Sequence, residues 1–374
     1  MVIDGRIHDF RDEDGNAFIF PSVKKAFSEI SFDKMFLYNK NDGVRGFLPL
    51  LEKHVFGNRL QTLIFQSFIT LGIKDGFIRL VLNYSEKNDK VIIPKPTWQG
   101  YEKVCNGLQR SCLFVSFFKD KKCNVDGIVS EVCEVLKQQD SVIVVLNTPC
   151  HNPSGYSLTR EEFRNFITEI NKVSLGKTIY LFWDIVYLEY EDVELSRDLF
   201  LELENLSENV ICIAQYSFSK SFLLYGMSLG LMTIVGKKTK ELDAVVRIEE
   251  VFQDTLASNR SPYLEYVFQR IFLSSNLYKE LQSDVLHVRS VLEKRSHYVK
   301  EQVKQCNMDM LPYLNGWKTF LITNHSAFIC NELKKNDIFF MPNRLGICIP
   351  VSSLTVCELE KVFDCFKNIV GREK

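Results

Sequence analysis

The stretches Ser141-Val-Ile-Val-Val-Leu-Asn147 and Thr178-Ile-Tyr-Leu-Phe-Trp-Asp184 decide the fold of this chain. Each is an apolar run of strand length that ends in a polar residue, and a helix-like segment separates them. Strands that are apolar on both faces are typical of a parallel sheet covered by helices on both sides. The sequence therefore predicts an α/β fold with a mainly parallel sheet between helices. Four more runs extend the pattern: Lys90–Pro94, Cys112–Phe117, Val210–Tyr216 and Leu229–Val235.

Beyond about Ser261 the pattern changes to long helices and short strands, which is typical of a smaller α+β domain. The first forty or so residues carry a loop signal at Arg11-Asp-Glu-Asp-Gly15 and a helix start near Pro21, and the pattern leaves open which domain they join. The predicted C-terminal elements are helices within Tyr266–Gln305, strands near Lys318–Thr323, Ile338–Met341 and Gly346–Pro350, and a helix over Val356–Ile369.

The composition is that of a globular protein, with 374 residues, 46 basic and 47 acidic side chains and 46% hydrophobic residues. The sequence has no basic stripe of the kind that binds nucleic acid, and no apolar run approaches the length of a membrane span. We therefore expect neither nucleic acid nor membrane as a partner. The start, Met1 to Asp9, lacks the apolar core of a secretory signal, and the 11 cysteines include no CxxC pair. We expect a cytoplasmic protein without a metal site.

Polar residues follow four of the predicted strands, at the edge where open α/β sheets bind their ligands. They lie in Pro96-Thr-Trp98, Asn147-Thr-Pro-Cys-His-Asn-Pro-Ser-Gly155, Asp184-Ile-Val-Tyr187 and Ser217-Phe-Ser-Lys220. Singly, each has an ordinary structural explanation: Asp184 as a helix cap, Asn152 in a turn, Tyr187 and Trp98 in the core, and Lys220 on the surface. Together they suit pyridoxal 5′-phosphate (PLP).

Each of these residues suits one part of that cofactor. Asp184 would keep the ring nitrogen protonated, which makes the ring an electron sink. Asn152 and Tyr187 would donate to the ring's phenolate oxygen, and Trp98 would stack on its face. Lys220 would form the Schiff base and carry the proton.

In their order and spacing the motifs resemble the class I aminotransferases of PLP fold type I, specifically the aspartate aminotransferase branch. The resemblance spans almost the whole chain. Beside the four motifs above it rests on Asp9-Phe-Arg-Asp-Glu-Asp-Gly15 with Pro21-Ser-Val-Lys-Lys-Ala26, Tyr38 with Gly43 and Phe47, Ser217-Phe-Ser-Lys220-Ser-Phe-Leu-Leu-Tyr-Gly226, and Arg344-Leu-Gly-Ile347.

The resemblance implies a homodimer that exchanges an amino group between an amino acid and a 2-oxo acid, with Lys220 as the catalytic residue. It implies that Tyr38 reaches the partner subunit's cofactor phosphate and that Arg344 grips the substrate α-carboxylate. We predict a large PLP-binding domain over residues 38–260 and a small domain formed by residues 1–37 and 261–374.

Two departures from the family concern the cofactor phosphate. Ser228 stands where the family has a phosphate-binding arginine, and Ser217 and Ser219 offer only neutral hydrogen bonds. The helix N-terminus that cradles the phosphate has two possible registers, Ser67–Thr70 or Ile73–Gly76. We favour the first, with Ser67 as N-cap. The second brings in Lys74 as a replacement cation, and Arg260 is another candidate.

Two more departures concern the substrate. Asp254 stands where dicarboxylate-specific members carry an arginine, so it would repel aspartate and attract a cationic or amide side chain; alternatively it is a solvated helix-end residue. His8 stands where the family has a glycine beside the substrate. We therefore expect an aminotransferase whose amino donor is not a simple dicarboxylate. The alternatives are a PLP enzyme of elimination, replacement or cyclisation at the side chain, and a non-catalytic descendant of the fold.

Overall fold

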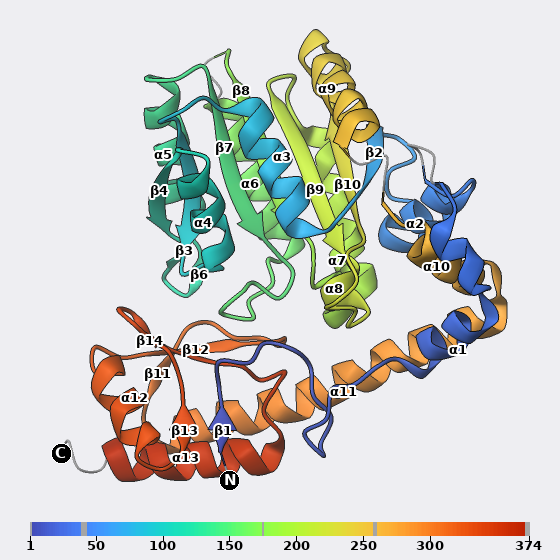
Figure 1. The fold of residues 1–374 in the computed structure, drawn as a ribbon. Helices are drawn as coiled ribbons and strands as arrows, with labels where there is room; N and C mark the ends of the chain where they lie inside the picture. The colour runs from blue at the N-terminus through green and yellow to red at the C-terminus, as the bar shows by residue number, and fades with distance from the viewer. Residues whose placement is uncertain (1, 39–42, 174–175, 257–259, 371–374) are drawn as a thin grey trace.

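The computed structural model describes residues 2–38, 43–173, 176–256 and 260–370. Its chain forms a large body around one sheet and a smaller body, with the long helix α11 (Ser275–Gln305) running between them (Figure 1). None of the described helices is both long enough and apolar enough to cross a membrane.

A seven-stranded sheet, in the order β2-β10-β9-β8-β7-β3-β4, forms the centre of the large body. Strand β10 runs antiparallel to its neighbours β2 and β9, whereas β9, β8, β7, β3 and β4 are parallel to one another. The α/β prediction is confirmed, and the six predicted strands are present within two residues of their expected bounds. The strands are β2 (Ile64–Thr70), β3 (Lys90–Lys95), β4 (Ser111–Ser116), β7 (Ser141–Asn147), β8 (Thr178–Asp184), β9 (Val210–Ser217) and β10 (Gly230–Gly236).

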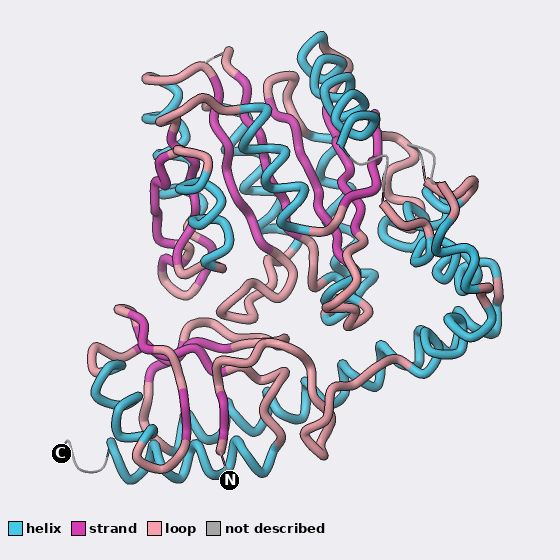
Figure 2. Tube along the Cα trace, viewed as in Figure 1, coloured by secondary structure: helices cyan, strands magenta, loops and turns pink. Residues whose placement is uncertain are grey.

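Alternating side chains of the buried strands pack into two separate apolar layers. In β7, Ile143 and Val145 join the cluster that holds Phe77, Leu80 and Tyr101. The residues between them, such as Val144, join the larger cluster on the opposite face. Helices therefore cover both faces of the sheet, as the tube view also shows (Figure 2). On the first face lie α3 (Ile73–Tyr84), α4 (Gln99–Gly107) and α9 (Lys240–Leu256), and on the second α5 (Val125–Leu136) and α6 (Arg160–Lys172).

The smaller body contains a four-stranded antiparallel sheet, in the order β11-β12-β15-β14, and the parallel pair β1-β13. Strand β1 comes from the start of the chain and pairs with a strand more than 300 residues later, since Ile3 is opposite Ile338. The elements are β1 (Ile3–Asp4), β11 (Asp309–Met310), β12 (Thr319–Ile322), α12 (Ser326–Lys334), β13 (Ile338–Phe339), β14 (Pro342–Asn343), β15 (Gly346–Ile349) and α13 (Val356–Val370). The division of the chain at residues 38 and 260 stays a prediction.

The remaining elements connect these layers. The hairpin β5-β6 follows β4, and α1 packs against α10 and α11. Their bounds are α1 (Pro21–Glu29), η1 (Phe32–Phe36), α2 (Phe47–Phe56), β5 (Phe118–Lys119), β6 (Lys122–Cys123), η2 (Leu188–Tyr190), α7 (Val193–Asp198), η3 (Leu199–Asn205), α8 (Phe218–Ser221) and α10 (Tyr263–Leu273).

The register of the parallel strands brings their polar ends together. Asn147, the last residue of β7, is opposite Asp184, the last residue of β8. Asp184 is in turn opposite Gln215, two residues before β9 ends at Ser217. Parallel strands carry their carboxyl ends to one edge of the sheet, so the chemistry predicted from these motifs gathers at that edge.

Candidate active site

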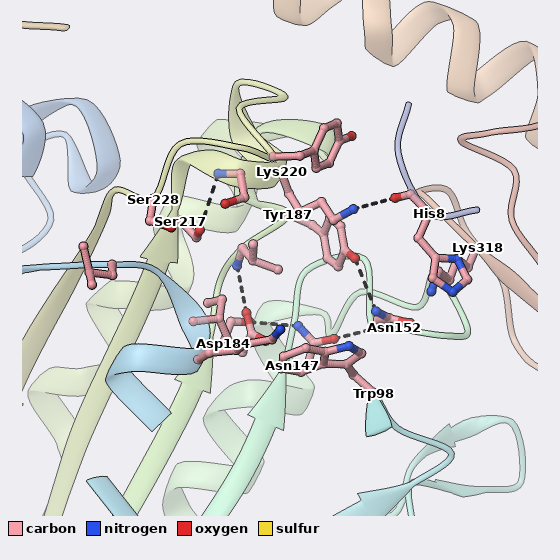
Figure 3. Close-up of a pocket in the computed structure, with 16 residues that line it drawn as sticks. His8, Trp98, Asn147, Asn152, Asp184, Tyr187, Ser217, Lys220, Ser228 and Lys318 are labelled. Atoms are coloured by element: carbon pink, nitrogen blue, oxygen red, sulfur yellow. Dashed lines mark hydrogen bonds between the residues drawn. The ribbon is translucent and has the colours of Figure 1, made fainter. Parts of the chain in front are cut away.

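A cavity of about 350 Å³ lies at the carboxyl edge of the sheet, between the large and small bodies. Residues at or just beyond the ends of β3, β7, β8 and β9 line it, together with the start of α3. The small body contributes His8 and Lys318. The close-up places Ser217 and Ser228 at one end, His8 and Lys318 at the other, and Lys220, Tyr187 and Asp184 between them (Figure 3).

Of the described residues that line the cavity, Asp184 is the one that is acidic. It is 3% exposed, and its Oδ1 accepts a hydrogen bond of 3.0 Å from the backbone N–H of Val186. Its Oδ2 accepts another from the hydroxyl of Tyr101, against whose ring Trp98 packs edge-on. Burial raises the pKa of Asp184 to about 6, although both hydrogen bonds favour the ionised form. A cation in the cavity would stabilise this carboxylate.

A short hydrogen-bond chain links the ends of β7 and β8 to Tyr187. The side chain of Asn147 donates to the backbone oxygen of Asp184 at 3.1 Å and accepts from the backbone N–H of Asn152 at 2.7 Å. Asn152 Nδ2 then lies 3.3 Å from the hydroxyl of Tyr187. Burial raises the pKa of Tyr187 above its ordinary value, so the phenol stays protonated and able to donate.

Lys220 lies in the four-residue helix α8 directly after β9, and its side chain crosses the cavity toward the small body. Its Nζ donates to the backbone oxygen of His8 at 2.6 Å. The same nitrogen lies 4.5 Å from the ring centre of Tyr225 and 4.6 Å from that of Trp317. Burial, and then the positive charge of Lys318, lower the pKa of Lys220 to about 7. The amine is therefore a usable nucleophile and proton carrier near neutral pH.

Hydroxyl groups and a helix N-terminus form the opposite end of the cavity. Ser217, Ser219 and Ser228 line it, and Ser217 Oγ accepts a hydrogen bond of 3.4 Å from the backbone N–H of Ser219. Helix α3 begins there, and Lys74 in its first turn also lines the cavity. Gly72 has a φ of +98°, and a Cβ at this position would lie 2.8 Å from Ser217 Oγ, so glycine permits the close approach.

The prediction that Ser67 caps the helix of this cradle is wrong. Ser67 lies inside strand β2, opposite Thr233, and its hydroxyl is 2.9 Å from the hydroxyl of that residue. The segment Ile64–Thr70 is a sheet strand, and the helix begins only at Ile73. The structure therefore has the second register, which brings Lys74 to the cavity.

Beside Ser67, three predicted site residues lie outside the cavity of this chain. Arg344 is exposed in the turn between β14 and β15 and does not line the cavity, so its contact with the substrate stays a prediction. Asp254 is exposed near the end of α9, and Tyr38, with 79% of its surface exposed, precedes a segment outside the described residues. Arg260 pairs with Glu265 at 2.9 Å and lines a second cavity that shares Leu71 and Ser228 with the first.

The sequence interpretation did not select Asn147, Tyr225 or Lys318, which all line the cavity. Asn147 ends a predicted strand, and Tyr225 lies five residues after Lys220, so both carried a positional signal. Lys318 is a single lysine before a short strand of the small body, and nothing in its sequence context marks it. His8 was predicted, and the structure places it in the lining.

A model of the family described as Aminotransferase class I and II matches residues 6–349. Among curated proteins, the mitochondrial aspartate aminotransferase of Gallus gallus is 21% identical over 243 residues, which are 63% of this chain and 56% of that protein. The corresponding enzyme of Xenopus tropicalis is 22% identical over the same shares of the two chains. The match thus spans a little over half the length of these relatives.

Solved structures share the fold at low sequence identity. An aminotransferase from Anaerococcus prevotii superposes with a TM-score of 0.91 at 22% identity, over 99% of this chain and 91% of that chain. The cytoplasmic aspartate aminotransferase of Saccharomyces cerevisiae gives 0.81 at 17% identity, over 98% and 92%. An aromatic-amino-acid aminotransferase from Burkholderia pseudomallei, covalently bound to pyridoxal phosphate, gives 0.79 at 18% identity, over 99% and 92%.

Proposed function

Because the chain belongs to the aminotransferase class I and II family, we propose that it binds PLP on Lys220 and transfers an amino group between an amino acid and a 2-oxo acid. The activity, the cofactor, the substrates and the partner subunit are all parts of this proposal.

The observation that carries the proposal is that Asp184 and Lys220 both line one cavity, on different sides of it. Asp184 is buried, and among the described residues its carboxylate accepts hydrogen bonds from the neutral donors Val186 and Tyr101. A protonated ring nitrogen is a cation of the size and position that this carboxylate suits. Lys220, with a pKa lowered to about 7, lies on the far side of the cavity, where the cofactor's carbonyl carbon would attach.

When bound, PLP supplies an electron sink that stabilises negative charge on the substrate's α-carbon. The residues of this chain would supply the rest. Lys220 would move the proton at that carbon, because its pKa lies near neutral pH. Tyr187 and Asn152 would donate hydrogen bonds to the phenolate oxygen, and Trp98 would cover one face of the ring.

The serine end of the cavity would take the phosphate. The backbone N–H groups at the start of α3 suit a phosphate dianion, and Ser217, Ser219 and Ser228 add hydroxyl donors. Lys74 would provide the charge that the family obtains from an arginine at the position of Ser228. A flexible lysine makes one charged contact where arginine makes two, so we expect weaker phosphate binding than in the family.

The proposal also includes a partner subunit and a cellular location. We propose a homodimer, in which the exposed Tyr38 and Asp254 act at the partner subunit's cavity. Asp254 would then disfavour a simple dicarboxylate as amino donor. A cytoplasmic location belongs to the same proposal, supported by eleven cysteines that all have free thiols.

The test is a half-reaction with purified protein that has been loaded with PLP. The protein is incubated with each of a panel of amino acids and no oxo acid, and the cofactor is then released and identified by chromatography. Conversion to pyridoxamine phosphate in at least one case supports the proposal. Release of ammonia or of a cyclised product, with the cofactor unchanged throughout the panel, would show side-chain chemistry instead. An unchanged cofactor and no product would contradict both activities.

A further inference from the structure

Lys318 lines the cavity, and the proposed function gives it no role. It lies between Trp317 and strand β12, in the small body, and it reaches the cavity from the side opposite α3 and the serines (Figure 3). The residue is 9% exposed. Most of its side chain is thus enclosed by protein, and it lines a space of ligand size.

No hydrogen bond or ion pair connects Lys318 Nζ to another group in the part of the chain that the structure describes. Its charged neighbour is Lys220, which carries the same sign when protonated. A second neighbour, His8, is neutral at pH 7, because burial and the two lysines lower its pKa to about 4. Burial likewise raises the pKa of the Cys348 thiol, which keeps that group uncharged.

A buried ammonium group without a counterion is unfavourable, and an anionic ligand is what removes the cost. The cavity has basic side chains from Lys74, Lys220 and Lys318 and one acid, Asp184, so its net charge favours an anion. Lys74 lies at the phosphate end. Lys318 lies at the far end, beyond Lys220, where a substrate whose amino group replaced Lys220 on the cofactor would extend its remaining groups.

We propose that Lys318 binds the α-carboxylate of the substrate amino acid. This inference rests on the proposed function, and it gives Lys318 the role that the sequence resemblance implied for Arg344, which lies outside the cavity. The contact is one charge-assisted hydrogen bond from a point charge, in place of a bidentate guanidinium pair. His8, beside it, would be a neutral wall of the same subsite.

A first test needs no cofactor. The cofactor-free protein is unfolded by heat with sodium propanoate, with the neutral isostere propanamide, and with sodium chloride at equal ionic strength. A ligand that binds only the folded state raises the unfolding midpoint. We expect propanoate to raise it in the unmodified protein and in Lys74→Met, and to lose this effect in Lys318→Met. An equal propanoate effect in the unmodified protein and in Lys318→Met would overturn the proposal.

A second test uses the PLP-loaded protein and two reagents that attack its cofactor, aminooxyacetate and O-methylhydroxylamine. Only the first carries a carboxylate. The preference is the ratio of the reaction rate with aminooxyacetate to the rate with O-methylhydroxylamine. We expect this ratio to be higher for the unmodified protein than for free PLP in solution. The preference should fall about 10- to 100-fold in Lys318→Met, the range for one hydrogen bond to a charged group. Lys318→Arg should keep most of it, and Arg344→Met, outside the cavity, should keep all of it.

The outcomes separate the inference from the function on which it rests. If the unmodified protein shows no greater preference for aminooxyacetate than free PLP does, the role of Lys318 is overturned, even if Lys318→Met fails to fold. A preference lost in Arg344→Met and kept in Lys318→Met returns the role to Arg344. If PLP does not attach but the propanoate effect depends on Lys318, the anion site stands and the proposed function falls.

Discussion

The Nζ of Lys220 donates a hydrogen bond of 2.6 Å to the backbone oxygen of His8, 212 residues earlier in the chain. Lys220 lies at the carboxyl edge of the large sheet. His8 follows β1, which pairs with β13 of the small body. The contact therefore joins the two bodies across the cavity. It also holds the amine at the end where Lys318 lies.

Attachment of PLP to the cofactor-free protein should become faster as the pH rises through about 7, because only the neutral amine of Lys220 attacks the cofactor. Lys318→Met removes a positive charge that lowers this pKa, so it should move the profile to higher pH. The measurement is the rate at which the visible band of bound PLP appears, at a series of pH values. A profile that does not respond to pH between 6 and 9 would contradict the shifted pKa of Lys220.

Lys220→Met should stabilise the cofactor-free protein, most strongly at low pH. The pKa of Lys220 is lowered in the folded state from 10.5 to about 7, so its charge costs stability fully below about 7. This cost is relieved as the pH rises from about 7 to 10.5. We expect the gain in unfolding midpoint to be about 1–3 °C or more at pH 6 and smaller at pH 9. Equal gains at both pH values would be the contrary result.

Asp184→Asn should leave PLP able to attach to Lys220 while slowing amino transfer by about 10²- to 10³-fold, since the charge that stabilises the protonated ring is lost. Tyr101→Phe, which removes only the hydrogen bond to Asp184, should have a much smaller effect. Half-reaction rates at saturating amino acid measure both. A large loss in Tyr101→Phe with normal rates in Asp184→Asn would reverse the assigned roles.

Lys74→Met should weaken binding of PLP but leave binding of pyridoxal, which lacks the phosphate, nearly unchanged. Ser67→Ala is the matched control, because Ser67 contacts Thr233 within the sheet and not the cavity. It should cost about 1 kcal/mol of stability through the lost hydrogen bond and leave both affinities as they are. Equilibrium titrations of the two compounds make the comparison. A selective loss of PLP affinity in Ser67→Ala would argue for the first register after all.

The ring end of the candidate site could be predicted because its residues follow strong local signals. Asp184 ends an apolar strand, and Asn152 and Lys220 follow two others, and parallel strands place such ends at one edge whatever the details of packing. Ser67 was misplaced because Ile64–Thr70 is a short segment of mixed apolar and polar residues, and periodicity over so few residues does not separate a strand from a helix.

The opposite end of the site depends on how the small body packs against the sheet. Lys318 and Arg344 are both basic residues beside short strands, and the four-stranded sheet directs one into the cavity and the other to the surface. That choice follows from tertiary packing over long sequence separation, which a local pattern does not encode.

The central claim is that Lys220 carries PLP, and the absorption spectrum tests it directly. PLP is added to the purified protein and to Lys220→Ala, excess cofactor is removed by dialysis, and visible spectra are compared. We predict a band of bound cofactor that sodium borohydride fixes onto the peptide containing Lys220, and no such band in Lys220→Ala. A protein that shows no band after loading, or one whose band survives in Lys220→Ala, would contradict the account.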